Sequence, residues 1–91
     1  MERNQPDLLK KRVYLMNIPY DAYTHEIENL CKEFVKVNRV VIPRDPNGLA
    51  RGYAFVYLDN QKDVQTLIDY VDGRHLRSRQ IRAKSSLGEA I

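Results

Sequence analysis

The chain has 91 residues, 43% hydrophobic and 30% charged, which suits one small folded domain and excludes a low-complexity or disordered tract. No apolar run approaches the roughly 18 residues needed to cross a bilayer, and residues 1–10 contain no apolar stretch typical of a secretory signal. The single cysteine, Cys31, cannot form an internal disulfide, so we expect a reducing compartment, the nucleus before the cytoplasm. With only two histidines beside it, we expect no metal site and no cofactor.

The net charge is +3, and basic and acidic blocks alternate along the chain. Basic residues are concentrated in residues 1–12, 36–51 and 74–84, and acidic residues in 21–33 and 59–72. Basic blocks that meet in space would form a patch suited to a polyanion. The alternative is that these runs are ordinary solvated faces.

The first half of the chain predicts a strand, a helix and a second strand. Residues 12–18 alternate in polarity as a half-buried strand does. The helix that follows has one apolar stripe at i, i+3, i+4 and i+7, formed by Ile27, Leu30, Cys31 and Phe34. We expect Thr24 to cap its N-terminus. A β-branched strand at residues 39–43 leads into a turn at 43–48.

The second half repeats the pattern in the order strand, helix, strand. The strands are expected at residues 52–58 and 80–84. The helix has its apolar stripe at Val64, Leu67, Ile68 and Val71. Asp59 or Asn60 could cap its start, and Gly73 is placed to end it. The order matches the split βαβ arrangement, so we predict a ferredoxin-like α+β fold in which two helices cover one face of a four-stranded antiparallel sheet.

Strand alternation divides the sheet into two faces. The face expected beneath the helices carries Val13, Leu15, Val40, Ile42, Ala54, Val56, Ile81 and Ala83. The opposite face carries Tyr14, Met16, Arg39, Tyr53, Phe55, Tyr57, Arg82 and Lys84. Because each helix has only one apolar stripe, we expect these rings to be exposed among cations, where bases can stack and phosphates can pair. The alternative is a sheet-on-sheet core or a dimer interface.

Two motifs resemble those of the RNA recognition motif family. Residues 51–58, Arg-Gly-Tyr-Ala-Phe-Val-Tyr-Leu, match its ribonucleoprotein octamer at seven of eight positions. The departure is Leu58, which stands where an aromatic is usual and which by parity points into the core. Residues 13–18, Val-Tyr-Leu-Met-Asn-Ile, resemble the family's hexamer. The resemblance covers residues 11–84, leaving a flexible arm at 1–10 and a tail at 85–91.

The resemblance implies a role for each matching residue. Tyr14 and Phe55 would each stack one base, Tyr53 would pack between two sugars, and Arg51 would pair with a phosphate. Arg82 and Lys84 would contact bases or backbone. The full expected RNA-binding set is Tyr14, Met16, Arg39, Arg51, Tyr53, Phe55, Tyr57, Arg82 and Lys84.

That prediction requires Tyr14 and Phe55 to be open to solvent. The implied partner is single-stranded RNA, bound by a monomeric domain that forms one module of an RNA-processing or RNA-regulatory protein. A protein partner within a ribonucleoprotein complex is a further expectation.

Two other function classes are alternatives for this chain. A protein-binding relative would use the helical face and an Arg-x-Phe element; residues 74–76 read Arg-His-Leu, where leucine replaces the aromatic. An enzyme is not expected, because His25 and His75 are fifty residues apart and Cys31 lies on an apolar stripe.

The sequence does not decide the role of two groups of residues. Tyr20 and Tyr23 either extend the stacking surface or pack on the helix start. Lys10, Lys11 and Arg12 are either a phosphate-contacting arm or a charged flank.

Overall fold

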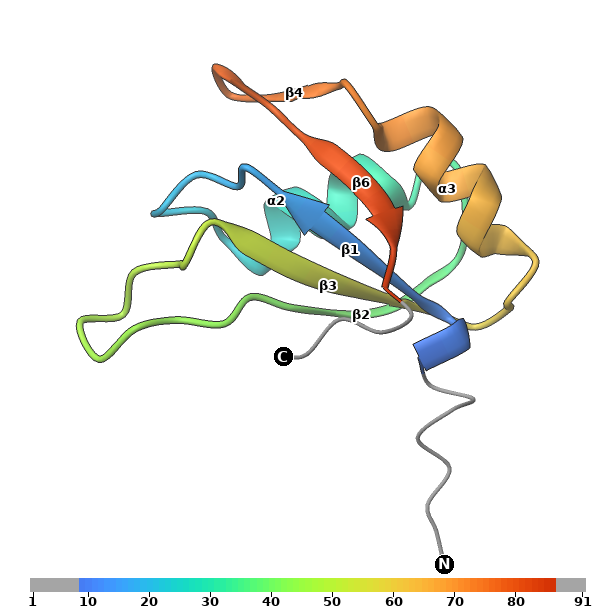
Figure 1. Ribbon diagram of the computed structural model, residues 1–91, viewed down its shortest axis with the longest axis horizontal. Coiled ribbons are helices and arrows are strands. Elements are labelled where there is room, and N and C mark those ends of the chain that lie inside the picture. Colours follow the sequence, from blue (N-terminus) through green and yellow to red (C-terminus); the bar gives the residue numbers. More distant parts are fainter. Residues whose placement is uncertain (1–8, 87–91) are drawn as a thin grey trace, which may run out of the picture.

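The structure is a computed structural model, and it describes residues 9–86 (Figure 1). One antiparallel sheet has the strand order β2–β3–β1–β6. Its strands are β1 (Arg12–Met16), β2 (Val37–Val41), β3 (Tyr53–Leu58) and β6 (Arg82–Ser85). The helices α2 (Thr24–Cys31) and α3 (Asp63–Val71) pack on one face, which confirms the predicted fold class. Most of the expected flexible arm at 1–10 and tail at 85–91 lies outside the described residues.

The core lies between the sheet and the two helices, as the alternation of the strands predicts. The central pair β1 and β3 sets Val13 opposite Val56 and Leu15 opposite Ala54, so these side chains face the helices together. The residues expected beneath the helices are buried there, except Val40, which is half-buried against the same cluster. Leu58 is also in the core, as its parity predicts.

Helix α2 begins differently from the prediction. Its N-cap is Tyr23 and not Thr24, which is already helical. The backbone N–H of Tyr23 donates to Glu26 Oε1 at 2.8 Å, and the N–H of Glu26 donates to the Tyr23 carbonyl at 3.0 Å. Because the Glu26 carboxylate supplies the capping contact, the Thr24 hydroxyl is not needed. The helix also ends at Cys31, so Phe34 packs against the core from the turn that follows.

The N-cap of α3 also differs from the prediction, since it is Lys62 and not Asp59 or Asn60. Backbone carbonyls of the preceding turn accept the first helical N–H groups; that of Asn60 accepts from Asp63 at 3.1 Å. The Asp59 carboxylate instead accepts from Asn38 at 3.1 Å, and this bond and an ion pair with Lys36 lower the pKa of Asp59. Gly73, with φ +93°, follows the C-cap as predicted.

Several strand ends are shifted from their expected positions. Strand β1 stops at Met16 because Asn17 turns the backbone into the left-handed region at φ +67°. Strand β2 occupies Val37–Val41 instead of residues 39–43, with an irregularity in its pairing between Val37 and Arg39. Strand β3 starts one residue late, after Gly52 at φ +94°.

The predicted last strand at residues 80–84 is divided in two. A small hairpin, β4 (His75–Leu76) with β5 (Arg79–Gln80), precedes β6, and the hairpin turn includes Arg77 at φ +57°. Buried Ile81 separates β5 from β6, and its N–H and carbonyl bond to Arg74 and Gly73, each at 2.7 Å. These bonds fold the chain back and break the strand.

Cys31 is fully buried on the apolar stripe of α2, and burial raises the pKa of its thiol to about 12. Since the thiolate is the reactive form, we expect iodoacetamide to alkylate Cys31 roughly a thousandfold more slowly in the folded protein than in denaturant at mildly alkaline pH. Mass spectrometry of timed samples measures both rates. Comparable rates would contradict the packing described here.

Candidate nucleic-acid interface

Three rings meet on the face of the sheet opposite the helices. Tyr14 of β1 lies directly across from Phe55 of β3, and Met16 lies across from Tyr53. The ring centroids of Tyr14 and Phe55 are 5.3 Å apart, those of Tyr14 and Tyr53 5.7 Å, and those of Tyr53 and Phe55 5.8 Å. We call Tyr14, Tyr53 and Phe55 the aromatic trio. Strand pairing therefore brings together the three principal rings that the two motifs predict.

The expected exposure of these rings is only partly correct. Tyr14 and Tyr53 are half-buried and keep an accessible surface. Phe55, expected to be open to solvent, is fully buried, and Tyr57 is only 9% exposed. The physical reason is Arg12, whose guanidinium carbon lies 4.3 Å from the centre of the Phe55 ring.

Arg12 is held in this position by both polar and aromatic contacts. Its Nε donates to the hydroxyl of Ser86, its second terminal nitrogen to the Ser86 carbonyl at 3.3 Å, and its first to the Tyr57 hydroxyl at 3.4 Å. Arg12 is 3% exposed and Ser86 is fully buried. Hydrogen bonds and the cation–π contact compensate the burial of the guanidinium. Arg12 is therefore part of the sheet face and not an exposed arm.

The other predicted cations occupy different surroundings. Lys84 Nζ lies 5.6 Å from the Tyr14 ring centre, and the Arg39 guanidinium carbon lies 5.1 Å from that of Tyr57. Arg82 pairs with Asp72, with 3.2 Å from Nε to Oδ1. Arg51 is exposed, and its side chain forms no ion pair with the described residues. The structure thus brings Lys84 and Arg39 to the rings and leaves Arg51 accessible beside Tyr53.

The residues considered for catalysis are scattered. His25 is exposed and its ring stacks on Tyr23, with centroids 5.4 Å apart, while His75 is exposed on β4. Within residues 9–86, no three His, Cys, Asp or Glu side chains gather as a metal ion would require. The same part of the chain holds no helix with the length and apolarity to span a membrane.

Two functional candidates were missed at the level of sequence. Arg12 is expected from the sequence only as part of an arm or a charged flank, because its contact with Ser86 joins residues 74 positions apart. In the sequence Arg79 stands out only as a member of the basic block at residues 74–84, yet its guanidinium carbon lies 5.4 Å from the ring centre of Tyr20. No local pattern signals that second contact.

The sheet order and the paired motifs define a class of small nucleic-acid-binding domain. The chain belongs to the RNA recognition motif family, whose model matches residues 13–82. Its fold is similar to that of the Rna15 RRM solved with bound RNA (GU), with a TM-score of 0.77, 29% identity, and coverage of 89% of this chain and 87% of that one.

Curated relatives point to the same family. The chain is 37% identical over 73 residues to the RNA-binding protein CP31B, chloroplastic, of Arabidopsis thaliana, and 38% identical over 73 residues to the 28 kDa ribonucleoprotein, chloroplastic, of Spinacia oleracea. Each match covers 78% of this chain but only 25% and 31% of those proteins. Since both relatives are chloroplast proteins, family membership gives no support to the expected preference for the nucleus.

Proposed function

We propose that this chain binds single-stranded RNA on the sheet face that carries the aromatic trio. The observation that supports this most is the clustering of Tyr14, Tyr53 and Phe55 within 6 Å of one another, in a chain that belongs to an RNA-binding family. A base stacks on Tyr14, sugars pack against Tyr53, and phosphates pair with Arg51 and Lys84. Stacking of a base on an aromatic ring contributes about 1–3 kcal/mol.

Phe55 serves as the second stacking ring only after the Arg12 guanidinium moves away. The guanidinium now occupies the position over the ring that a base would take, 4.3 Å from its centre. RNA binding must therefore exchange one cation–π contact and the bonds to Ser86 for a stacked base. This exchange lowers the net gain at Phe55, so a domain that reads a few nucleotides should bind in the micromolar range, about −8 kcal/mol.

The remaining predicted residues surround the trio. Met16 lies across from Tyr53 and contacts the edge of a base, and Arg39 beside Tyr57 pairs with backbone. Arg82 contacts the RNA either after it leaves Asp72 or while it keeps that ion pair. The module would act within an RNA-processing or RNA-regulatory protein, since the curated relatives named above are longer than this chain.

Amide shift mapping with short RNA of randomised sequence tests this proposal. We expect the largest shifts along β1 and β3, and we expect the Arg12 Nε–H and Ser86 N–H signals to shift with them as the guanidinium is displaced. Shifts confined to the trio with Arg12 unmoved would contradict the displacement. Unmoved signals across the whole sheet at millimolar RNA would contradict the proposal itself.

A second candidate function is the binding of a partner protein on the helical face. Its support is an aromatic pair there, since Phe34 and Tyr70 stack with centroids 4.7 Å apart and Tyr70 is 52% exposed. Against it, Leu76 of the Arg-His-Leu segment packs on the core and is not presented to a peptide. A partner that shifts signals of α2 and α3 while RNA leaves β1 and β3 unmoved would favour this function.

A further inference from the structure

A further aromatic–cation pair lies outside the four-stranded sheet, between Tyr20 in the loop after β1 and Arg79 of β5. The Tyr20 side chain is 58% exposed, and the Arg79 guanidinium carbon lies 5.4 Å from its ring centre. Arg79 Nε is buried and has no hydrogen-bond partner among the described residues. An unpaired buried donor is costly, and it indicates a place where an acceptor from a ligand would be stabilising.

Two hollows in the surface meet at Tyr20. One, of about 460 Å³, lies between Tyr20, Leu49 and Arg79. The other, of about 640 Å³, is bordered by the same Tyr20 and Leu49 and extends to Arg51 and Tyr53. Since Tyr53 belongs to the aromatic trio, the larger hollow borders the sheet face, and the smaller one adjoins it at Tyr20 and Leu49. A strand of RNA bound to the trio could therefore extend along the hollows to Tyr20.

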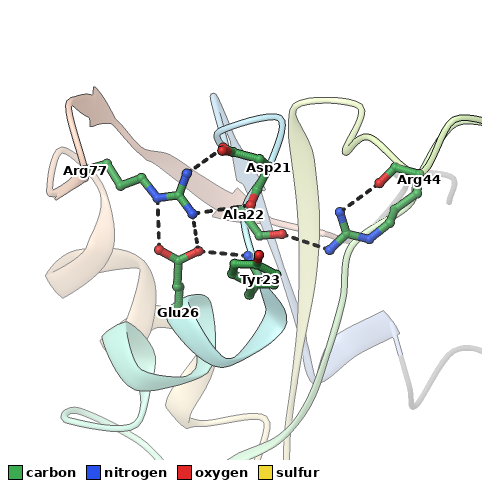
Figure 2. Close-up of polar contacts among 7 residues, drawn as sticks. Asp21, Ala22, Tyr23, Glu26, Arg44 and Arg77 are labelled. Atoms are coloured by element: carbon green, nitrogen blue, oxygen red, sulfur yellow. Dashed lines mark hydrogen bonds and ion pairs between the residues drawn. The ribbon is translucent and has the colours of Figure 1, made fainter.

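The hollows are held in shape by contacts between distant segments. Figure 2 shows Arg77 of the β4–β5 hairpin bonded to both oxygens of Glu26, at 2.6 and 3.0 Å, and to Asp21. The Arg77 bond is the largest cause lowering the pKa of Glu26, so the pair stays charged at neutral pH. Arg44 donates to the carbonyl of Ala22 at 2.8 Å. Two loops and a hairpin are thus fixed around Tyr20.

The charges of this region suit a nucleotide. The carboxylate of Asp21 is occupied by Arg77, and Oδ1 of Asp45 accepts the backbone N–H groups of Asn47 and Leu49 at 2.9 and 3.0 Å. Both acids therefore have partners within the protein. Among the described cations that line the hollows, Arg77 is paired with carboxylates, whereas Arg51 and Arg79 form no ion pair with described residues. Arginine can only donate hydrogen bonds.

We propose that Tyr20 and Arg79 form an additional nucleotide site, in which one unstacked base of the same RNA strand lies against the Tyr20 ring and accepts hydrogen bonds from Arg79. This inference rests on the proposed function, because the site is reached by a strand already bound to the trio. Tyr23, 61% exposed in the same loop, is excluded from the site because its ring stacks on His25 and lines neither hollow.

The test compares RNA of two lengths by fluorescence anisotropy. Randomised oligonucleotides of three and of seven nucleotides are titrated into the wild type, Tyr20→Ala, Arg79→Met and the double variant. We expect both single substitutions to weaken the longer RNA on the order of tenfold and to leave the shorter one unchanged. The double variant should lose little more than either single one, because the two residues act on one base.

Tyr23→Ala is the matched control, because Tyr23 is a tyrosine in the same loop as Tyr20 and is similarly exposed. It should leave the affinities for both RNA lengths unchanged. Tyr20→Ala that weakens neither RNA, or both equally, would overturn the additional site while the proposed function stands. Failure of the wild type to bind either RNA would overturn the proposed function, and the site with it. Circular dichroism of each variant checks folding, and Arg79→Met gives an independent result should Tyr20→Ala be unfolded.

Discussion

Replacing Phe55 by alanine is expected to lower the free energy of unfolding by about 3 kcal/mol. The ring is fully buried beneath Arg12 and contacts both other members of the aromatic trio, so its removal leaves a cavity under a guanidinium. The cation–π contact is lost at the same time. Urea denaturation followed by circular dichroism measures the change, which should appear as a lower midpoint with an unchanged slope.

Phe55→Leu is the matched control for this prediction. Leucine retains most of the buried volume, so its cost should stay below about 1.5 kcal/mol. Because the leucine variant remains folded but has no π-face, it also reports on stacking separately from stability. We expect it to weaken RNA binding. A Phe55→Ala variant as stable as the wild type would show that the ring is exposed and that Arg12 does not cover it.

Replacing Tyr14 by alanine is expected to weaken RNA binding by about 1–3 kcal/mol, a factor of roughly 5 to 150. Tyr14 is the half-buried ring of the trio on β1, and Lys84 Nζ lies over it at 5.6 Å from its centre, farther than the 4.3 Å between the Arg12 guanidinium carbon and the centre of Phe55. Isothermal titration calorimetry with a short RNA measures the change. Circular dichroism should show that the variant remains folded.

Tyr70→Ala is the control for Tyr14→Ala, since Tyr70 is an exposed tyrosine on α3, away from the sheet face. It should leave the RNA affinity unchanged. Titrations at several salt concentrations separate stacking from charge, because each phosphate contact contributes about −0.7 to the slope of log affinity against log salt. Tyr14→Ala should lower the affinity and keep that slope. A change in slope with unchanged affinity at low salt would contradict the stacking role.

The two faces of the sheet could be predicted from the sequence because side chains alternate along a strand whatever the rest of the fold does. Val13, Leu15 and Val56 alternate with Tyr14 and Phe55, and that alternation alone separates the core from the trio. Helix positions followed in the same way from the 3.6-residue period. The capping residues could not be predicted in this way, because a backbone N–H donates to any nearby acceptor, and at Tyr23 that acceptor is the Glu26 carboxylate.

What covers or extends the binding face was decided by the tertiary structure. Arg12 lies over Phe55 because β1 and the end of β6 are neighbours, which brings Ser86 to a residue 74 positions earlier. Tyr20 meets Arg79 because Arg77 draws the β4–β5 hairpin onto the start of α2. Such contacts depend on the spatial path of loops and strand ends, for which the sequence has no period. Local periodicity therefore determined which residues face outward, and only the packing of distant segments determined which of them a ligand can reach.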